Sequence, residues 1–182
     1  MSRIAIPASI ETSPAASQPL LEAVKKQLGS APNLFRLLGV NPVALEGHLG
    51  LFGALGKGHV DLKTRQRIAI RVAENNGCDY CLSAHTFLGK NLAKLDDSEL
   101  ADNRTGHSSD TKADAALAFV DEVMKTRGHV SDAALAAVRA AGYNDGDVLE
   151  IVLHIALNTL TNYVNSVAAT PIDFPVVKAT AR

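Results

Sequence analysis

The chain has 182 residues, of which 47% are hydrophobic and 20% charged, and its formal net charge is −1. That length suits one compact domain, and the composition is that of an ordinary globular protein. The near-neutral charge, without any cluster of Lys and Arg, argues against nucleic-acid binding. The most apolar stretch, residues 148–160, is interrupted by polar side chains, and residues 1–14 lack the apolar run of a secretory signal. We therefore expect a soluble, cytoplasmic protein without membrane association.

The composition also favours helices. Aromatic residues make up only 4% of the chain and Trp is absent, whereas Ala and Leu occur throughout, a mixture that suits helices better than strands. No segment alternates in the period-two pattern of a strand. The sequence thus predicts an all-α fold, with an N-terminal arm over residues 1–16 and a single helical domain over residues 17–182.

Apolar spacing and capping residues place the helices in chain order. The first is predicted over residues 18–28, ended by Gly29, and the second over 42–55, started by Asn41 and Pro42. A third runs from Asp61 to the helix-breaking run at 75–77, followed by residues 78–88. Asp96 and Glu99 resemble a capping box, and residues 103–109 are predicted to be a surface loop between two helical lobes. The last three helices are predicted over 115–125, 131–141 and 145–167.

The only two cysteines are three positions apart, a pattern that indicates reactivity or metal binding rather than a disulfide framework. On a helix, Cys78 and Cys81 are neighbours at i,i+3, and His85 lies one turn beyond Cys81. A thiolate is favoured by an imidazole partner and by a helix N-terminus. After a thiolate has reacted with a peroxide, a nearby second thiol can condense with the sulfenic acid to form a disulfide. The redox motif at 74–88 is therefore the candidate site.

Two other interpretations fit these residues. The run C-x-x-C-x-x-x-H supplies three zinc ligands, but no second ligand pair accompanies it. The cysteines could also be small buried hydrophobes, although their neighbours Asp79, Tyr80 and Ser83 are polar. We predict neither a metal nor a bound cofactor, and we expect Asp79 to be an exposed acid and Tyr80 a packing residue.

The run from Asn75 to His85, with its C-x-Y-C-x-x-x-H core, resembles the signature of the AhpD-like alkylhydroperoxidase and carboxymuconolactone decarboxylase superfamily, in particular its peroxidase-related branch. The similarity extends from about Asn33 through residues 64–90 to 150–165. It implies an all-helical fold, a homotrimer or homohexamer, and reduction of small-molecule hydroperoxides through a disulfide that a partner dithiol of protein or lipoyl type resets. By this resemblance Cys81 attacks the peroxide, Cys78 is the exposed resolving thiol, and His85 belongs to a proton relay.

One position departs from the family pattern. AhpD-like members usually carry a relay Glu twelve residues before the first cysteine, where this chain has Gln66. Glu74, four residues before Cys78, is a substitute if one unbroken helix carries both, because Gln66 would then lie roughly 18 Å away. A break at Asn75-Asn76-Gly77 would instead allow Gln66 to fold back and would separate Glu74 from the thiols. Glu74 is also compatible with a solvated carboxylate near a helix end.

A second polar feature is a stripe at i+4 steps on an otherwise apolar helix, formed by Glu150, His154, Asn158 and Asn162. Buried polar groups need partners, so the stripe meets water, binds a subunit or lines the redox pocket. A histidine satisfied within the core is the other interpretation of His154. His48 on the helix over 42–55 is left unassigned.

The leading hypothesis is thus a thiol-dependent peroxidase using Cys81, Cys78 and His85, with Glu74 as a relay candidate. A decarboxylase-type activity without thiols is one alternative, since members that decarboxylate carboxymuconolactone lack the cysteine pair. A non-enzymatic oligomer that senses redox state or binds zinc is another.

Overall fold

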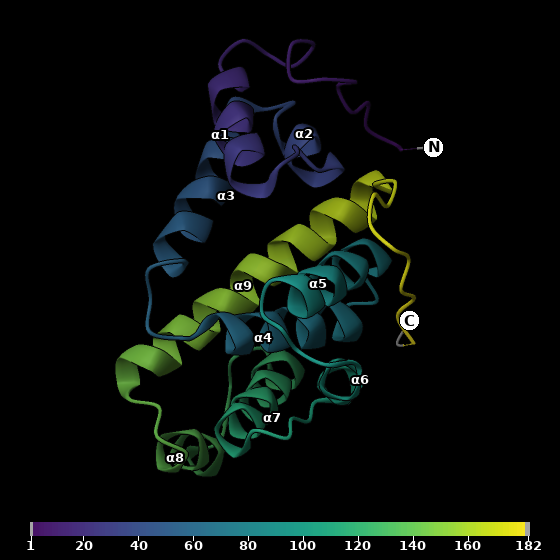
Figure 1. The fold of residues 1–182 in the computed structure, drawn as a ribbon. Coiled ribbons are helices and arrows are strands. Elements are labelled where there is room, and N and C mark those ends of the chain that lie inside the picture. The colour runs from purple at the N-terminus through teal and green to yellow at the C-terminus, as the bar shows by residue number, and fades with distance from the viewer. Residues whose placement is uncertain (1, 181–182) are drawn as a thin grey trace.

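The computed structural model describes residues 2–180, so residue 1 of the predicted arm and residues 181–182 of the predicted domain lie outside the described residues. Within that range the chain forms nine helices and no strand, which confirms the all-α prediction (Figure 1). In chain order the helices are α1 (Gln18–Leu28), α2 (Asn33–Leu38), α3 (Pro42–Leu55), α4 (Leu62–Asn75), α5 (Asp79–Asn91), α6 (Asp97–Thr105), α7 (Thr111–Thr126), α8 (Asp132–Ala140) and α9 (Asp145–Ala168).

Side-chain caps explain where most of these helices begin. A cap oxygen accepts a hydrogen bond from a backbone N–H of the first turn, which has no partner within the helix. The capping residues of this kind are Asn41, Asp61, Asp96, Asp110, Ser131 and Asn144. Because Asp110 caps it, α7 starts four residues before its predicted start. The sequence missed α2, whose six residues are too few for a periodic pattern and which has no side-chain cap.

The long helix α9 crosses the whole molecule and joins its two parts (Figure 1). Helices α1 to α3 lie on one side of α9 and α4 to α8 on the other, where α4, α5, α7 and α8 contact it. Both α6 and α7 contact α4, so the prediction that residues 103–109 separate two lobes is wrong; the chain passes between the two parts at residues 56–61. Asn103 is also fully buried in α6 rather than exposed in a loop.

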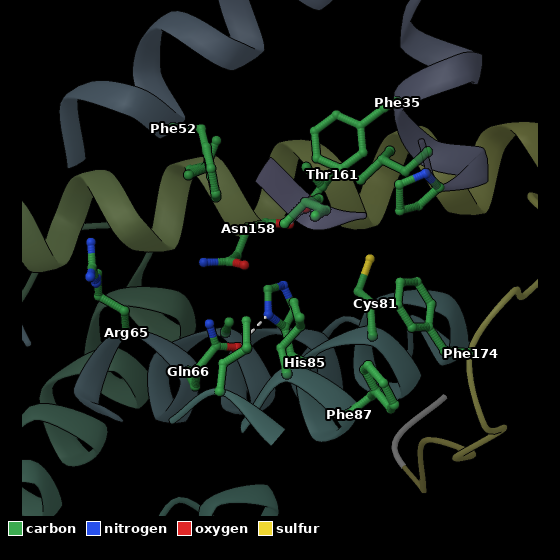
Figure 2. Close-up of a pocket in the computed structure, with 18 of the residues that line it drawn as sticks. Phe35, Phe52, Arg65, Gln66, Cys81, His85, Phe87, Asn158, Thr161 and Phe174 are labelled. Atoms are coloured by element: carbon green, nitrogen blue, oxygen red, sulfur yellow. Dashed lines mark hydrogen bonds between the residues drawn. The ribbon is translucent and has the colours of Figure 1, made fainter. Parts of the chain in front are cut away.

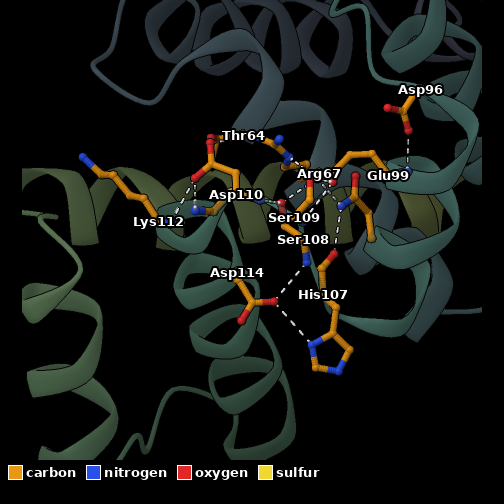
Figure 3. Close-up of polar contacts among 12 residues, drawn as sticks. Thr64, Arg67, Asp96, Glu99, His107, Ser108, Ser109, Asp110, Lys112 and Asp114 are labelled. Atoms are coloured by element: carbon orange, nitrogen blue, oxygen red, sulfur yellow. Dashed lines mark hydrogen bonds and ion pairs between the residues drawn. The ribbon is translucent and has the colours of Figure 1, made fainter.

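A polar cluster joins α4, α6 and α7 (Figure 3). The Asp96 carboxylate accepts from the backbone N–H of Glu99 at 2.8 Å, which is the first half of the predicted capping box. The second half does not form, because the Glu99 carboxylate turns inward and accepts from Arg67 Nε at 2.7 Å and from Ser109 Oγ at 2.6 Å. This cluster fixes the middle helices against one another.

Both chain ends pack against the helices. Near the N-terminus, Arg36 of α2 donates to the backbone oxygen of Pro7 at 3.1 Å. At the other end, residues 170–180 run back along α5, where the Val177 N–H donates to Ser83 Oγ at 2.9 Å. No helix within residues 2–180 has the length and apolar character of a membrane span.

Candidate dithiol site

A tight turn between α4 and α5 builds the start of the site. Gly77 has a φ of +64°, a left-handed conformation that favours glycine. Its N–H donates to the Glu74 carbonyl at 3.0 Å and the Cys78 N–H donates to the Ala73 carbonyl at 2.9 Å, the bond pair of a Schellman motif. The motif ends α4 and sends the chain back antiparallel as α5. The hypothesis of one unbroken helix through 74–88 is therefore wrong.

This turn brings the two thiols together at a helix N-terminus. Cys78 is the N-cap of α5, where its sulfur accepts from the Cys81 N–H at 3.3 Å. The Cys78 thiol also donates to the Cys81 sulfur, with the two sulfur atoms 2.7 Å apart. Both cysteines are free thiols. The backbone thus holds the pair where formation of a disulfide requires little movement.

The two cysteines differ in what they face. Each is only 3% exposed, but Cys81 lines the large cavity described below and Cys78 does not. Cys78 instead packs in an apolar cluster with Leu82, Ala179 and other residues, partly from the C-terminal segment. The expectation that Cys78 is exposed is therefore wrong, because residues 170–180 cover the start of α5.

His85 and Gln66 meet as a consequence of the same reversal (Figure 2). The Gln66 Oε1 atom lies 2.9 Å from His85 Nδ1. Since an amide oxygen only accepts, Nδ1 carries the proton and Nε2 is the basic nitrogen of a neutral imidazole. Burial lowers the pKa of His85 to about 4, so the ring is neutral at pH 7. Gln66 thus selects the tautomer that can accept a proton.

Glu74 is not part of this arrangement. Its carboxylate accepts from Arg104 Nε at 2.8 Å and from the Thr180 N–H at 2.6 Å, and it does not line the cavity with Cys81 and His85. The hypothesis that Glu74 substitutes as the relay base therefore fails, because the Schellman turn separates it from the face of α5 that carries Cys81 and His85. The Glu74 carboxylate instead links α4 to α6 and to the C-terminal segment.

The thiol of Cys81 opens into a cavity of about 540 Å³ between α3, α4, α5 and α9. Figure 2 shows the sulfur and the His85 ring directed into it from α5, with Asn158 and Thr161 of α9 on the opposite side. Much of the remaining wall is apolar or aromatic. Such a volume falls in the range of about 300–1,000 Å³ that small-molecule sites occupy.

The polar stripe of α9 has two roles. His154 and Asn158, in its middle, line the cavity, as one of the three interpretations of the stripe requires. At its ends, Glu150 accepts from the His59 N–H at 2.8 Å, and Asn162 accepts from Asn76 of the α4–α5 turn at 2.9 Å. Glu150 therefore holds a loop in place, whereas Asn162 both holds the α4–α5 turn and, as a side-chain donor near the Cys81 sulfur, helps to lower the pKa of Cys81.

The pKa values of the two thiols shift in opposite directions because the two sulfur atoms have different surroundings. Burial raises the pKa of Cys81, but the hydrogen bonds that its sulfur accepts from Cys78 and Asn165 outweigh burial and lower it. The same hydrogen bond, together with burial, raises the pKa of Cys78. The thiolate therefore forms on Cys81, the sulfur that faces the cavity.

Sequence reasoning missed Asn165, whose Nδ2 atom donates to the Cys81 sulfur at 3.2 Å. Asn165 continues the polar stripe by three residues beyond Asn162, which is the signal that could have pointed to it. Within residues 2–180, no group of three or more His, Cys, Asp and Glu side chains is arranged to hold a metal ion. Asp79 accepts from the Ala179 N–H at 2.9 Å, and Tyr80 is buried.

The described residues thus form an all-helical domain with a dithiol at a helix N-terminus and an imidazole one turn beyond it. Residues 48–122 match the model of the carboxymuconolactone decarboxylase family. The resemblance to the AhpD-like and carboxymuconolactone decarboxylase superfamily is thereby confirmed, together with the structural similarities below.

Solved structures share this fold over most of their length. An uncharacterized peroxidase-related protein from Silicibacter sp. TM1040 is 25% identical with a TM-score of 0.77, covering 87% of this chain and 85% of that one. The alkylhydroperoxidase AhpD core protein from Ralstonia eutropha JMP134, also described as peroxidase-related, is 24% identical with a TM-score of 0.83, covering 94% and 92%. The debrominase Bmp8, in complex with 2,3,4-tribromopyrrole, is 21% identical with a TM-score of 0.79, covering 95% and 93%. No curated protein matched in a sequence search.

Proposed function

We propose that the protein is a thiol-dependent peroxidase that reduces organic hydroperoxides through a cycle of dithiol and disulfide at Cys78 and Cys81. The observation that carries the proposal is the 2.7 Å contact of two sulfur atoms, of which only Cys81 faces a cavity that can admit an organic substrate. The structural similarity to peroxidase-related proteins supports the same activity.

The proposed reaction has two steps within the protein. The Cys81 thiolate attacks the terminal oxygen of the hydroperoxide, the O–O bond breaks, and the alcohol leaves with a proton as Cys81 becomes a sulfenic acid. His85 Nε2 takes the proton of the Cys81 thiol and returns it to the leaving alkoxide. The Cys78 thiol then attacks the sulfenic sulfur, so that the disulfide forms and water leaves.

An external dithiol completes the cycle by reducing the disulfide while it is itself oxidised. Cys81 is the sulfur that the cavity reaches, whereas Cys78 lies beneath the C-terminal segment. A dithiol on a narrow, flexible chain, as in a lipoyl group, can enter the cavity and reach Cys81 more easily than a dithiol on the surface of a folded protein. We propose the lipoyl type as the reductant, and comparing reduction rates by a lipoylated domain and by a protein dithiol tests this choice.

Single cysteine variants test the assignment of the two thiols. Cys81→Ser should abolish peroxide-dependent oxidation, because Cys78 is buried and does not line the cavity that admits the peroxide. Cys78→Ser should react once and stop at a sulfenic acid on Cys81, which dimedone labelling and peptide mass mapping detect. A Cys81→Ser protein that consumes peroxide at an unaltered stopped-flow rate would falsify the proposal.

A second candidate reaction uses the same dithiol on a carbon–halogen bond. An aryl bromide and two thiols would give the arene, bromide with a proton, and the disulfide. The similarity to the debrominase Bmp8 favours this candidate, as does an aromatic cavity wall. Bromide release from a brominated pyrrole by the reduced protein tests it.

The alternatives without a redox reaction have tests of their own. A decarboxylase-type activity should survive the double replacement of Cys78 and Cys81 by Ser. Zinc binding should appear in elemental analysis of the purified protein, and a redox-sensing role should change the subunit mass on oxidation. Assembly as a homotrimer or homohexamer stays a prediction that sedimentation velocity tests; exposed apolar residues on α9, such as Leu149, Tyr163 and Val167, support it. A cytoplasmic location also stays a prediction.

A further inference from the structure

The aromatic residues of this chain are concentrated around one cavity. The chain has five Phe and three Tyr and no Trp. Five of these eight residues line the cavity: Phe35, Phe52, Tyr80, Phe87 and Phe174. The core beside α7 and α8, by contrast, is mostly aliphatic. Phe35, Tyr80 and Phe174 also belong to packed apolar clusters, so the two rings that core packing leaves unexplained are Phe52 and Phe87.

The rings form two groups on either side of the Cys81 sulfur. In one group, His48 lies between two Phe rings, 5.7 Å from the centroid of Phe35 and 6.1 Å from that of Phe52. In the other, the Phe174 ring lies 5.9 Å from the rings of both Tyr80 and Phe87. Figure 2 shows Phe35 and Phe52 across the cavity from Phe87, with Phe174 beside Cys81.

Two of these rings are incompletely covered within the chain. Phe52 is 44% exposed and Phe87 is 40% exposed. Leaving aromatic surface in water is unfavourable, and a ligand in the cavity would cover it. Hydrogen peroxide is too small to do so, since its volume is close to that of two water molecules, roughly 60 Å³, and the cavity measures about 540 Å³. Covering these rings from within the cavity would take an organic ligand larger than hydrogen peroxide.

We propose that this cavity selects substrates that carry an aryl group, so that the preferred hydroperoxide is an aryl-alkyl one. The preference for an aryl-alkyl hydroperoxide as substrate rests on the proposed peroxidase function, whereas the binding of aryl ligands in the cavity does not. Rings prefer edge-to-face and offset contacts with other rings, and each such contact adds affinity beyond burial. Two such contacts correspond to about tenfold tighter binding of an aryl ligand than of an alkyl ligand.

The test compares two unreactive alcohols that differ only in this group. Cumyl alcohol carries a phenyl ring and hexyldimethylcarbinol carries a hexyl chain, on the same tertiary alcohol with the same number of carbon atoms. Apolar burial alone predicts that the hexyl compound binds at least as tightly. We expect the reduced full-length protein to bind cumyl alcohol about tenfold more tightly by calorimetry. Equal or tighter binding of the hexyl alcohol would overturn the inference.

A matched pair of variants locates the preference. Phe52→Leu removes one exposed ring of the cavity and should reduce the aryl to alkyl affinity ratio severalfold. Phe119→Leu makes the same chemical change in the core, at a ring that does not line the cavity. It should leave that ratio unchanged. A ratio that falls equally in both variants would contradict the proposal.

The corresponding hydroperoxides separate the inference from the proposed function. Cumene hydroperoxide should oxidise the dithiol about tenfold faster, as second-order rate constants, than the hexyl analogue. If both hydroperoxides fail to react while cumyl alcohol binds preferentially, the peroxidase proposal fails and the aryl site stands. If both react and neither the alcohols nor the rates differ, the aryl site fails and the peroxidase proposal stands.

Discussion

The polar cluster around Glu99, which joins α4, α6 and α7, and the dithiol cavity differ in how their buried polar groups are hydrogen-bonded. The residue Glu99 is only 5% exposed, and its carboxylate oxygens accept hydrogen bonds from Arg67, Asn103, Ser108 and Ser109 (Figure 3). In the cavity wall, His48 Nδ1 is buried without a hydrogen-bond partner among the described residues, and His154 Nε2 has only the Glu150 carboxylate near it, at 3.6 Å.

We infer from this difference that the cluster stabilises the fold and that the cavity binds a ligand. A charge whose partners all come from the chain stabilises the fold and leaves nothing to offer a ligand. An unpartnered polar atom in an apolar cavity costs stability, and a ligand that hydrogen-bonds it recovers that cost. Changes in the cluster should therefore alter the free energy of unfolding, and changes around the thiols should alter reactivity. The predictions below test this division, beginning with the largest effect.

The strongest test removes the acid at the centre of the cluster. Glu99→Ala should lower the free energy of unfolding by about 3–5 kcal/mol, because Arg67 would be left charged and buried. Asp97→Ala is the control, since its carboxylate is 78% exposed and pairs with Lys90 of α5; such surface pairs contribute about 0–1 kcal/mol. Urea denaturation measures both. Equal losses would show that the cluster is no more structural than the surface.

Acid should weaken the protein through Glu74. Burial raises the pKa of this carboxyl, but hydrogen bonds from Arg104 and Thr180 outweigh burial and lower it to about 2. Because the folded pKa lies below the unfolded one, the stabilisation is complete above pH about 4.5 and is lost as pH falls towards 2. The loss amounts to about 3 kcal/mol. Glu74→Gln should flatten this part of the curve of unfolding free energy against pH, and curves that stay parallel would contradict the assignment.

Restoring a carboxylate at position 66 should strengthen the relay. Gln66→Glu places a negative charge beside His85 Nδ1 and should raise the pKa of His85 from about 4 by roughly two pH units. The more basic imidazole takes the Cys81 proton more readily, so we expect about tenfold faster peroxide oxidation of the dithiol at neutral pH. Glu74→Gln is the control and should leave this rate unchanged in folded protein. Chemical-shift titration of His85 checks the pKa itself.

Local sequence signals predicted most of the fold. Side-chain caps such as Asn41 and Asn144 act within one helical turn, so the sequence around them is enough to place the helix starts. The i,i+4 spacing of Cys81 and His85 likewise placed both residues on one face of α5. The thiol pair and its imidazole were therefore accessible from the sequence.

The features of the site that the sequence did not predict depend on contacts between distant segments of the chain. Whether Gln66 or Glu74 serves the site is decided by Gly77, whose left-handed conformation the sequence allows without requiring it. The aromatic wall joins Phe35 to Phe174 across nearly the whole chain. No local pattern predicts such a meeting, just as none predicted that the C-terminal segment would cover Cys78.

The smallest predicted effect concerns the hydrogen bond that Asn165 donates to the Cys81 sulfur at 3.2 Å. Asn165→Ala should raise the pKa of Cys81 by about one pH unit, since a hydrogen bond to a charged group contributes about 1.5–3 kcal/mol and part of it is replaced by water. At a pH below that pKa, the thiolate population and the alkylation rate of Cys81 should fall about tenfold. Iodoacetamide labelling across pH, mapped by mass spectrometry, measures this.

A variant that introduces a negative charge separates the effect of the hydrogen bond from that of packing. Asn165→Asp keeps the size of the side chain but replaces a donor with a carboxylate, so it should raise the pKa of Cys81 more than Asn165→Ala does. Asn158→Ala is the control, because the Asn158 side chain donates to the His154 carbonyl at 2.8 Å rather than to the sulfur. If the pKa of Cys81 moves equally in all three variants, loss of packing explains it. If it moves in the order Asp, Ala, control, then the donor at position 165 sets which sulfur carries the charge.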